Sequence, residues 1–173
     1  MYRIGIDLGG TNIAVGVVDD RHNIIAEASV PTGAFRPAEE MVADMCRAVE
    51  LALDKAGLIA ADCASIGIGS PGTCDSEAGV VMRAYNLGWF NVPVCRMLHE
   101  RFGIPVRLSN DANCAAIGRA DNLRASALGG AFCSPPPRSC SLSSVRSWIT
   151  SAANSLKRLS VTSNIQYHVL SIL

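Results

Sequence analysis

The sequence has no excess of charge of either sign and no long apolar run. With 15 basic and 15 acidic residues the formal net charge is zero, so nothing favours binding to nucleic acid or to an anionic membrane, and a small-molecule partner is expected. No run reaches the roughly 18 apolar residues that a membrane-spanning helix needs. The first residues do not resemble an export signal, because Asp7 and two glycines interrupt their apolar run.

Zinc-binding and disulfide patterns are also missing. The chain has 7 cysteines, but no two of them form a C-x-x-C pair, the spacing typical of a zinc site. Their number is odd, and no export signal is expected. We therefore predict reduced thiols that pack as small apolar groups in a cytoplasmic protein.

Enough apolar material is present for a folded core. The chain has 173 residues, of which 49% are hydrophobic and 17% charged, a composition typical of globular proteins. A domain of about 150 residues buries roughly 70% of the surface that its unfolded chain exposes. This length favours one domain, or one domain followed by a tail.

Composition divides the chain near Asp121. All 15 acidic residues lie within residues 1–121, whereas serine occurs 5 times up to residue 121 and 12 times beyond it. We predict a folded lobe over 1–120 and an atypical Ser-rich tail over 121–173. The tail has two interpretations: a replacement segment with an amphipathic helix, or the disordered product of a shifted reading frame after about Arg119. Its abrupt Ser, Arg and Pro richness favours the second.

Hydrophobic periodicity predicts an α/β lobe. Strands are predicted at 2–7, 13–18, 24–30, 64–68 and 106–108. Helices are predicted at 38–56, at 92–102 with Asn91 as the amino-terminal cap, and after Asn110, its amino-terminal cap, to about Arg119. The first three strands are close enough in sequence to pair antiparallel through short turns. The order β-β-β-α-β-α-β-α is that of an α/β lobe.

The predicted helix at 38–56 has an amphipathic pattern and signals at both of its ends. It carries an apolar stripe on one face, with Glu39 and Glu40 near its amino end and Gly57 as its carboxyl cap. The stripe consists of Met41, Met45, Ala48, Ala52 and Leu53.

A glycine-rich segment separates the first two predicted strands. In Asp7-Leu8-Gly9-Gly10-Thr11, the two glycines would let backbone N–H groups approach a phosphate, and Asp7 could hold magnesium, usually through water. No Gly-Lys-Ser/Thr follows, so this is not a P-loop. The alternative is a tight β-hairpin whose glycines serve only the turn.

Three further segments could contact a ligand. Residues 67–73 are small and follow a strand, which leaves room for a ligand, or they are an ordinary strand exit. Asn86 can donate to and accept from a sugar hydroxyl, whereas Trp89 is expected to be a packing residue. Asp111 lies between a strand and a helix, where a carboxylate can accept the proton of a hydroxyl that attacks a phosphate, or can simply stabilise the helix start.

Taken together, these segments resemble the ROK family of sugar kinases, most closely its bacterial glucokinases. The match consists of GIDLGGTNIAVGVVD at 5–19, GIGSPG at 67–72, NLGW at 86–89 and NDANCAA at 110–116. The resemblance covers about 120 residues, from the first predicted strand to the predicted third helix. It implies an actin/hexokinase-like (ribonuclease H-like) ATPase lobe, a mixed sheet flanked by helices, and the cofactors ATP and Mg²⁺.

The resemblance also implies roles for particular residues. Asp111 would be the catalytic base that activates the primary hydroxyl of the sugar, and Asp7 would hold magnesium through water. The implied ATP and phosphate site comprises Gly5, Asp7, Gly9, Gly10, Thr11 and Asn12. The implied sugar site comprises Gly69, Pro71, Gly72, Asn86, Asn110 and Asp111. Asn12 stands where many relatives carry lysine.

The function implied is ATP-dependent phosphorylation of a hexose, with glucose the favoured acceptor. Phosphorylation of N-acetylmannosamine, fructose or allose remains an alternative. The chain could also be a fragment of a sugar-binding ROK-type regulator. Such regulators carry a winged helix-turn-helix ahead of the kinase-like part, and we expect none here because the first predicted strand begins at residue 2. The NDAN and NLGW elements argue against a non-catalytic actin-like or chaperone module.

Full-length family members are expected to be homodimers and to have a second lobe with another glycine-rich phosphate loop, G-T-G-x-G-x-G. Residues 122–173 contain no such loop, so we expect this chain to be a truncated and inactive version.

Overall fold

The computed structural model describes residues 1–114 of the chain. The predicted tail at 121–173, and the continuation of the predicted third helix beyond Cys114, lie outside the described residues. The strands are β1 (Tyr2–Leu8), β2 (Asn12–Val18), β3 (Ile24–Pro31), β4 (Cys63–Ser70), β5 (Thr73–Asp75), β6 (Val80–Ala84), β7 (Trp89–Val92) and β8 (Val106–Asn110). The helices are α1 (Ala38–Ala56), α2 (Val94–Phe102) and the short 3-10 helix η1 (Ala60–Asp62).

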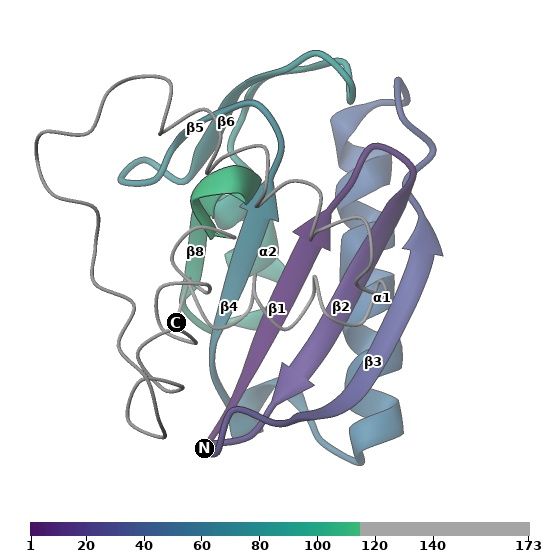
Figure 1. The fold of residues 1–173 in the computed structure, drawn as a ribbon, viewed down its shortest axis with the longest axis vertical. Helices are drawn as coiled ribbons and strands as arrows, with labels where there is room; N and C mark the ends of the chain where they lie inside the picture. Colours follow the sequence, from purple (N-terminus) through teal and green to yellow (C-terminus); the bar gives the residue numbers. More distant parts are fainter. Residues whose placement is uncertain (115–173) are drawn as a thin grey trace, which may run out of the picture.

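A five-stranded mixed sheet forms the centre of the lobe. Its strand order is β3-β2-β1-β4-β8, visible across the front of Figure 1. β1 pairs antiparallel with β2, and β2 pairs antiparallel with β3, whereas β1, β4 and β8 run parallel to one another. The mixed sheet and the antiparallel pairing of the first three strands are therefore confirmed.

α1 covers one face of this sheet, and its bounds agree with the prediction. The helix packs on β2 and β3 and lies behind them in Figure 1. Its five-residue apolar stripe is buried, and Met41 and Met45 are both 0% exposed. Burying such a side chain contributes about 1.5–3 kcal/mol. Gly57 ends the helix in the left-handed conformation with φ 67°, as expected of a carboxyl cap.

α2 begins two residues later than predicted, and Asn91 is not its cap. Asn91 and Val92 belong to β7, and Pro93 occupies the cap position before Val94. The reason is the proline, which disfavours a helical conformation in the residue that precedes it. α2 packs against β8 and α1, with Val94 and Leu98 buried.

A second, three-stranded sheet of order β5-β6-β7 was not predicted. Its strands have 3, 5 and 4 residues, too short for a clear alternation of apolar and polar side chains. The sheet extends beyond the carboxyl ends of β4 and β8 (Figure 1), where β5 contacts β8. It therefore borders the edge of the main sheet at which the predicted ligand-binding segments lie.

Candidate functional site

The carboxyl ends of the three parallel strands meet at one edge of the main sheet. Asp7 in β1 pairs with Gly69 in β4, and Gly69 pairs with Ser109 in β8. Two strand spacings, about 10 Å, therefore separate Asp7 from the strand that leads into Asp111. Asp7 and Asp111 thus belong to the same edge, where ligand sites of open α/β sheets collect.

The segment between β1 and β2 is a tight turn, here called the glycine turn (Gly9–Asn12). The N–H of Gly9 donates to the carbonyl of Asn12 at 3.0 Å. A Cβ on Gly9 would lie 2.8 Å from that carbonyl oxygen, so the turn requires glycine there. A tight hairpin turn is therefore present, and phosphate binding by its glycines stays a prediction. In the described part of the chain no hydrogen bond uses the N–H of Gly10 or of Thr11, and both residues are exposed.

Asn86 lies beside the glycine turn. A Cβ built on Gly10 would be 3.3 Å from Asn86 Nδ2, so the amide of Asn86 faces this glycine closely. Asn86 is exposed in a turn in which the N–H of Leu87 donates to Ala84 at 3.1 Å. Trp89 is 1% exposed, which confirms its packing role, and its indole N–H has no hydrogen-bond partner within residues 1–114.

Gly72 and Asn110 are directly linked. Asn110 Nδ2 donates to the carbonyl of Gly72 at 2.7 Å. Gly72 has φ 85°, and a Cβ there would be 2.1 Å from the carbonyl oxygen of Arg83 in β6. Only glycine fits this position, so packing alone explains the last glycine of GIGSPG. Pro71, beside it, is partly buried.

Asn110 also caps the helical turn that begins at Asp111. Its Oδ1 accepts from the N–H of Ala112 at 3.0 Å and from that of Asn113 at 3.3 Å. The predicted cap is therefore confirmed. Both ends of the Asn110 amide are engaged, which fixes its orientation at the edge of the sheet.

Asp111 is partly buried, and one of its carboxylate oxygens is engaged. Oδ1 accepts from the N–H of Ala112 at 2.7 Å, while Oδ2 makes no hydrogen bond to the described residues. Burial raises the pKa of the nearby Cys74 thiol, and the negative charge of Asp111 raises it further. This effect places Asp111 close to the β4–β5 connection that carries Gly72.

The structure brings most of the predicted site residues together, with one exception. Gly5 is buried in the middle of β1, where it pairs with Gly16 and Gly67, and it does not belong to the glycine turn. Asn12 is the exposed first residue of β2. Within residues 1–114 no cluster of three metal-ligating side chains occurs, so a magnesium ion here would depend on Asp7, on water and on phosphate oxygens.

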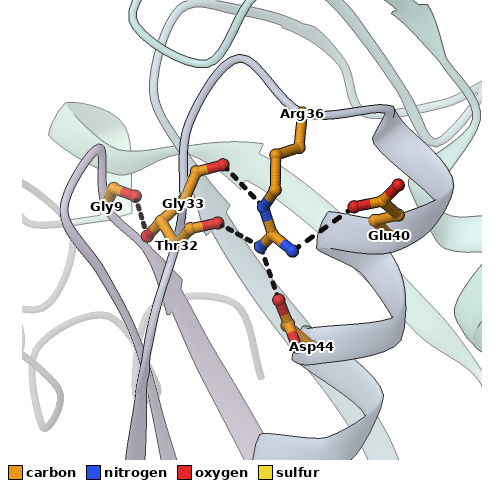
Figure 2. Close-up of polar contacts among 6 residues, drawn as sticks. All are labelled: Gly9, Thr32, Gly33, Arg36, Glu40 and Asp44. Carbon is orange, nitrogen blue, oxygen red and sulfur yellow. Dashed lines mark hydrogen bonds and ion pairs between the residues drawn. The ribbon is translucent and has the colours of Figure 1, made fainter.

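Sequence reasoning missed Thr32, which contacts the glycine turn, and Arg36, which contacts Thr32. Thr32 is 0% exposed, and its hydroxyl donates to the carbonyl of Gly9 at 2.7 Å. Arg36 donates to the carbonyl of Thr32 at 2.9 Å. Figure 2 shows these contacts together. A threonine and an arginine in a connecting loop carry no recognisable motif, so the sequence held no signal for them.

The described cysteines form no disulfide with one another, and several are buried. Burial raises the pKa of Cys63 and of Cys95 to about 11. These thiols are therefore protonated at neutral pH and weakly nucleophilic, which agrees with their predicted role as packing groups. In the part of the chain that the structure describes, no helix is long and apolar enough to cross a membrane.

The mixed sheet and its flanking helices define an actin/hexokinase-like lobe of the kind found in ROK sugar kinases. The ROK family pattern matches residues 3–126, and the chain therefore belongs to the ROK family. The solved glucokinase of Streptomyces griseus, in complex with glucose and AMPPNP, superposes with a TM-score of 0.62 at 38% identity, over 69% of this chain and 36% of that one.

Curated relatives include both kinases and regulators. The chain is 37% identical over 115 residues to the glucokinase of Streptomyces coelicolor, covering 66% of this chain and 34% of that enzyme. It is 32% identical over 115 residues to the xylose repressor of Caldicellulosiruptor bescii, covering 66% of this chain and 29% of the repressor. The chain thus spans about a third of the length of the relatives that it matches.

Proposed function

We propose that this lobe serves ATP-dependent phosphorylation of a hexose, with glucose the favoured acceptor. The observation that carries the proposal is the common edge that gathers Asp7, the glycine turn with Asn86, and Asp111. Phosphoryl transfer depends mainly on positioning and on stabilisation of charge around the phosphates. An edge that offers backbone N–H groups, an amide and two carboxylates supplies these elements. The Streptomyces griseus relative was solved with glucose and AMPPNP, which supports the choice of ligands.

In this proposal the glycine turn receives the phosphates of ATP. Gly9, Gly10, Thr11 and Asn12 present backbone N–H groups, and two of these make no hydrogen bond in the described chain. Asp7 would hold Mg²⁺ through water, which suits a cation that keeps most of its hydration shell. The bound Mg²⁺ would supply neutralisation of phosphate charge. Gly5 would not contact the phosphates; its contribution would be to the pairing of β1 with β2 and β4.

The sugar would bind on the other side of this edge. Gly69, Pro71, Gly72, Asn86 and Asn110 would line its site, and Asp111 would accept the proton of the primary hydroxyl. The hydroxyl oxygen attacks the γ-phosphorus of ATP. The bond between the γ-phosphorus and the oxygen that bridges it to the β-phosphate breaks, and ADP leaves. Oδ2 of Asp111, which has no hydrogen bond to the described residues, is the acceptor in this step. The reaction uses cytoplasmic ATP.

The acceptor sugar is the open part of the proposal, with N-acetylmannosamine, fructose and allose as further candidates. A second function, sugar binding in a regulator without catalysis, is supported by the similarity to the xylose repressor of Caldicellulosiruptor bescii. A regulator would bind sugar without needing a phosphate site. Nucleotide binding at the glycine turn is therefore the observation that separates the two.

Amide NMR of the 173-residue chain tests the proposal. Titration with Mg·AMPPNP should shift the resonances of the glycine turn, and titration with glucose should shift those of Asn86, Asn110 and Asp111. Asp111→Asn should alter the glucose response and leave the nucleotide response in place. Glucose shifts with no response to Mg·AMPPNP would favour the regulator, and no response at these residues to either ligand would contradict both functions.

A further inference from the structure

The loop between β3 and α1, here called the 32–36 loop (Thr32–Arg36), lies directly behind the glycine turn. Thr32 is 0% exposed, although the residues on either side of it, Pro31 and Gly33, are exposed. A buried hydroxyl without a partner costs about 1–3 kcal/mol, so a buried threonine in a surface loop is normally explained by the hydrogen bonds that it makes.

Thr32 donates two hydrogen bonds, and both are to the glycine turn. Its hydroxyl donates to the carbonyl of Gly9 at 2.7 Å, and its backbone N–H donates to the carbonyl of Thr11 at 2.8 Å. In a trans peptide the N–H points opposite to the carbonyl. Holding the Gly9 carbonyl toward Thr32 therefore directs the N–H of Gly10 away from Thr32, toward the side on which the proposed phosphates would bind.

Arg36 in turn fixes the position of Thr32. Its Nη2 donates to the carbonyl of Thr32 at 2.9 Å, and its Nε donates to the carbonyl of Gly33 at 2.9 Å. The same guanidinium pairs with Asp44 of α1 at 2.5 Å and with Glu40 at 3.5 Å. Figure 2 shows a continuous path from Gly9 through Thr32 and Arg36 to the helix.

The close fit of this loop requires glycine at position 33. Gly33 has φ 55°, and a Cβ there would be 2.5 Å from Arg36 Nε. Any other residue would displace the guanidinium or strain the backbone. The conformation of the 32–36 loop therefore depends on the contacts of the Arg36 side chain with the carbonyls of Thr32 and Gly33.

The other end of the 32–36 loop contacts the turn that carries Asn86. The N–H of Phe35 donates to the carbonyl of Leu87 at 3.2 Å. A Cβ on Gly88 would lie 3.2 Å from the Phe35 ring. Phe35 itself has φ 68°, an uncommon conformation for a residue of this size. One loop therefore supports both the glycine turn and the neighbouring Asn86 turn.

We propose that Thr32 and Arg36 are positioning residues for phosphate binding: Thr32 orients the peptides of the glycine turn, and Arg36 fixes Thr32 to α1. This inference rests on the proposed nucleotide site. Neither residue would touch the phosphates, since Thr32 acts on the carbonyl of Gly9 and Arg36 acts on the carbonyl of Thr32. Because the guanidinium donates to Asp44, the pKa of Arg36 is raised, and its side chain stays charged.

The decisive variant is Thr32→Val, which keeps the shape and removes the hydroxyl, with Thr32→Ser as the conservative control. In the ligand-free 173-residue chain, ¹⁵N relaxation should show faster motion at Gly10 and Thr11 in Thr32→Val and wild-type behaviour in Thr32→Ser. Inorganic tripolyphosphate and Mg·AMPPNP should each bind about five- to tenfold more weakly to Thr32→Val, the loss expected for one hydrogen bond.

Arg36→Met should change the same two measurements in the same direction. Its matched control is Arg101→Met, which removes the contact of Arg101 with Glu50 of α1 and leaves the 32–36 loop intact. The control should leave both the relaxation of Gly10 and the tripolyphosphate affinity unchanged. Equal effects of the two arginine substitutions would show general destabilisation and would overturn the inference.

Two further results separate this inference from the proposed function. If the wild type binds tripolyphosphate and Thr32→Val binds it equally well, the positioning role is wrong while the phosphate site stands. If the wild type binds neither probe, the proposed function fails, and the relaxation of Gly10 and Thr11 alone decides whether Thr32 orders the turn. Unchanged relaxation in Thr32→Val overturns the inference in either case.

Discussion

Among the described residues, Asn110 and Asp111 leave one donor and one acceptor without a hydrogen bond. An asparagine amide has two N–H donors, and within residues 1–114 one of those on Asn110 is used, in the bond to Gly72. Its Oδ1 is occupied by two backbone N–H groups. Oδ2 of Asp111 adds an acceptor beside it. A sugar hydroxyl both donates and accepts, so adjacent groups of this kind suit it.

The first prediction at this scale concerns Asp111 as the general base. Asp111→Asn keeps the size of the side chain and removes the proton acceptor. In a chimera that joins residues 1–114 to the remaining part of the Streptomyces coelicolor glucokinase, kcat should fall on the order of 10²- to 10⁴-fold, and KM for glucose should change far less. A coupled assay for ADP measures both.

The control for that experiment is Asn113→Asp. Asn113 is exposed, and its backbone N–H, which the substitution keeps, donates to Oδ1 of Asn110. It should retain most of the activity of the chimera. If Asp111→Asn also retains more than about a tenth of the activity, another group accepts the proton.

At the scale of elements, the sequence predicted those whose pattern repeats over enough residues. α1 has 19 residues and an apolar stripe that recurs at helical spacing, so both of its ends were predicted. The five strands of the main sheet were found as well, each one to three residues longer in the structure. β5, β6 and β7 were missed because 3 to 5 residues are too few to show a period.

The site was predictable only where a motif carried it. The glycine turn, Asn86 and Asp111 belong to segments with a recognisable pattern, and the parallel order of β1, β4 and β8 brings the turn and Asp111 to one edge. Thr32 and Arg36 are different, because the contacts that link them to each other and to the glycine turn are made to backbone carbonyls. A contact to a carbonyl leaves no trace in the identity of the partner residue, so sequence reasoning has nothing to match.

Two glycines at positive φ, each beside a helix or strand, allow the cost of a close backbone contact to be separated from the cost of the left-handed conformation. Gly72 (φ 85°) has a backbone oxygen 2.1 Å from its would-be Cβ, whereas Gly57 (φ 67°) has nothing within 4 Å. Gly57→Ala should therefore cost only the left-handed strain, about 1–2 kcal/mol. Gly72→Ala should cost clearly more, since β6 must also move away. Urea unfolding followed by circular dichroism measures the difference, and equal losses would contradict the tight contact between Gly72 and β6.

At the scale of the whole molecule, the described lobe corresponds to only part of the proteins that it resembles. It covers 34% of the Streptomyces coelicolor glucokinase and 36% of the solved Streptomyces griseus chain. The candidate site lies at one edge of the main sheet. In the proposed function, residues 1–114 supply one phosphate loop and one base.

The last prediction is that the 173 residues alone do not turn over glucose at a useful rate. With one phosphate loop, ATP would be held on one side only, and water would have access to the reacting groups, which weakens every electrostatic contact in the site. Weak binding of Mg·AMPPNP and glucose should remain measurable, because the groups at the sheet edge are already in place. A coupled assay for ADP with the purified chain should show no glucose-dependent rate above background, whereas the chimera with the Streptomyces coelicolor segment should show one. Robust turnover by the isolated chain that Asp111→Ala abolishes would demonstrate that a single lobe is sufficient.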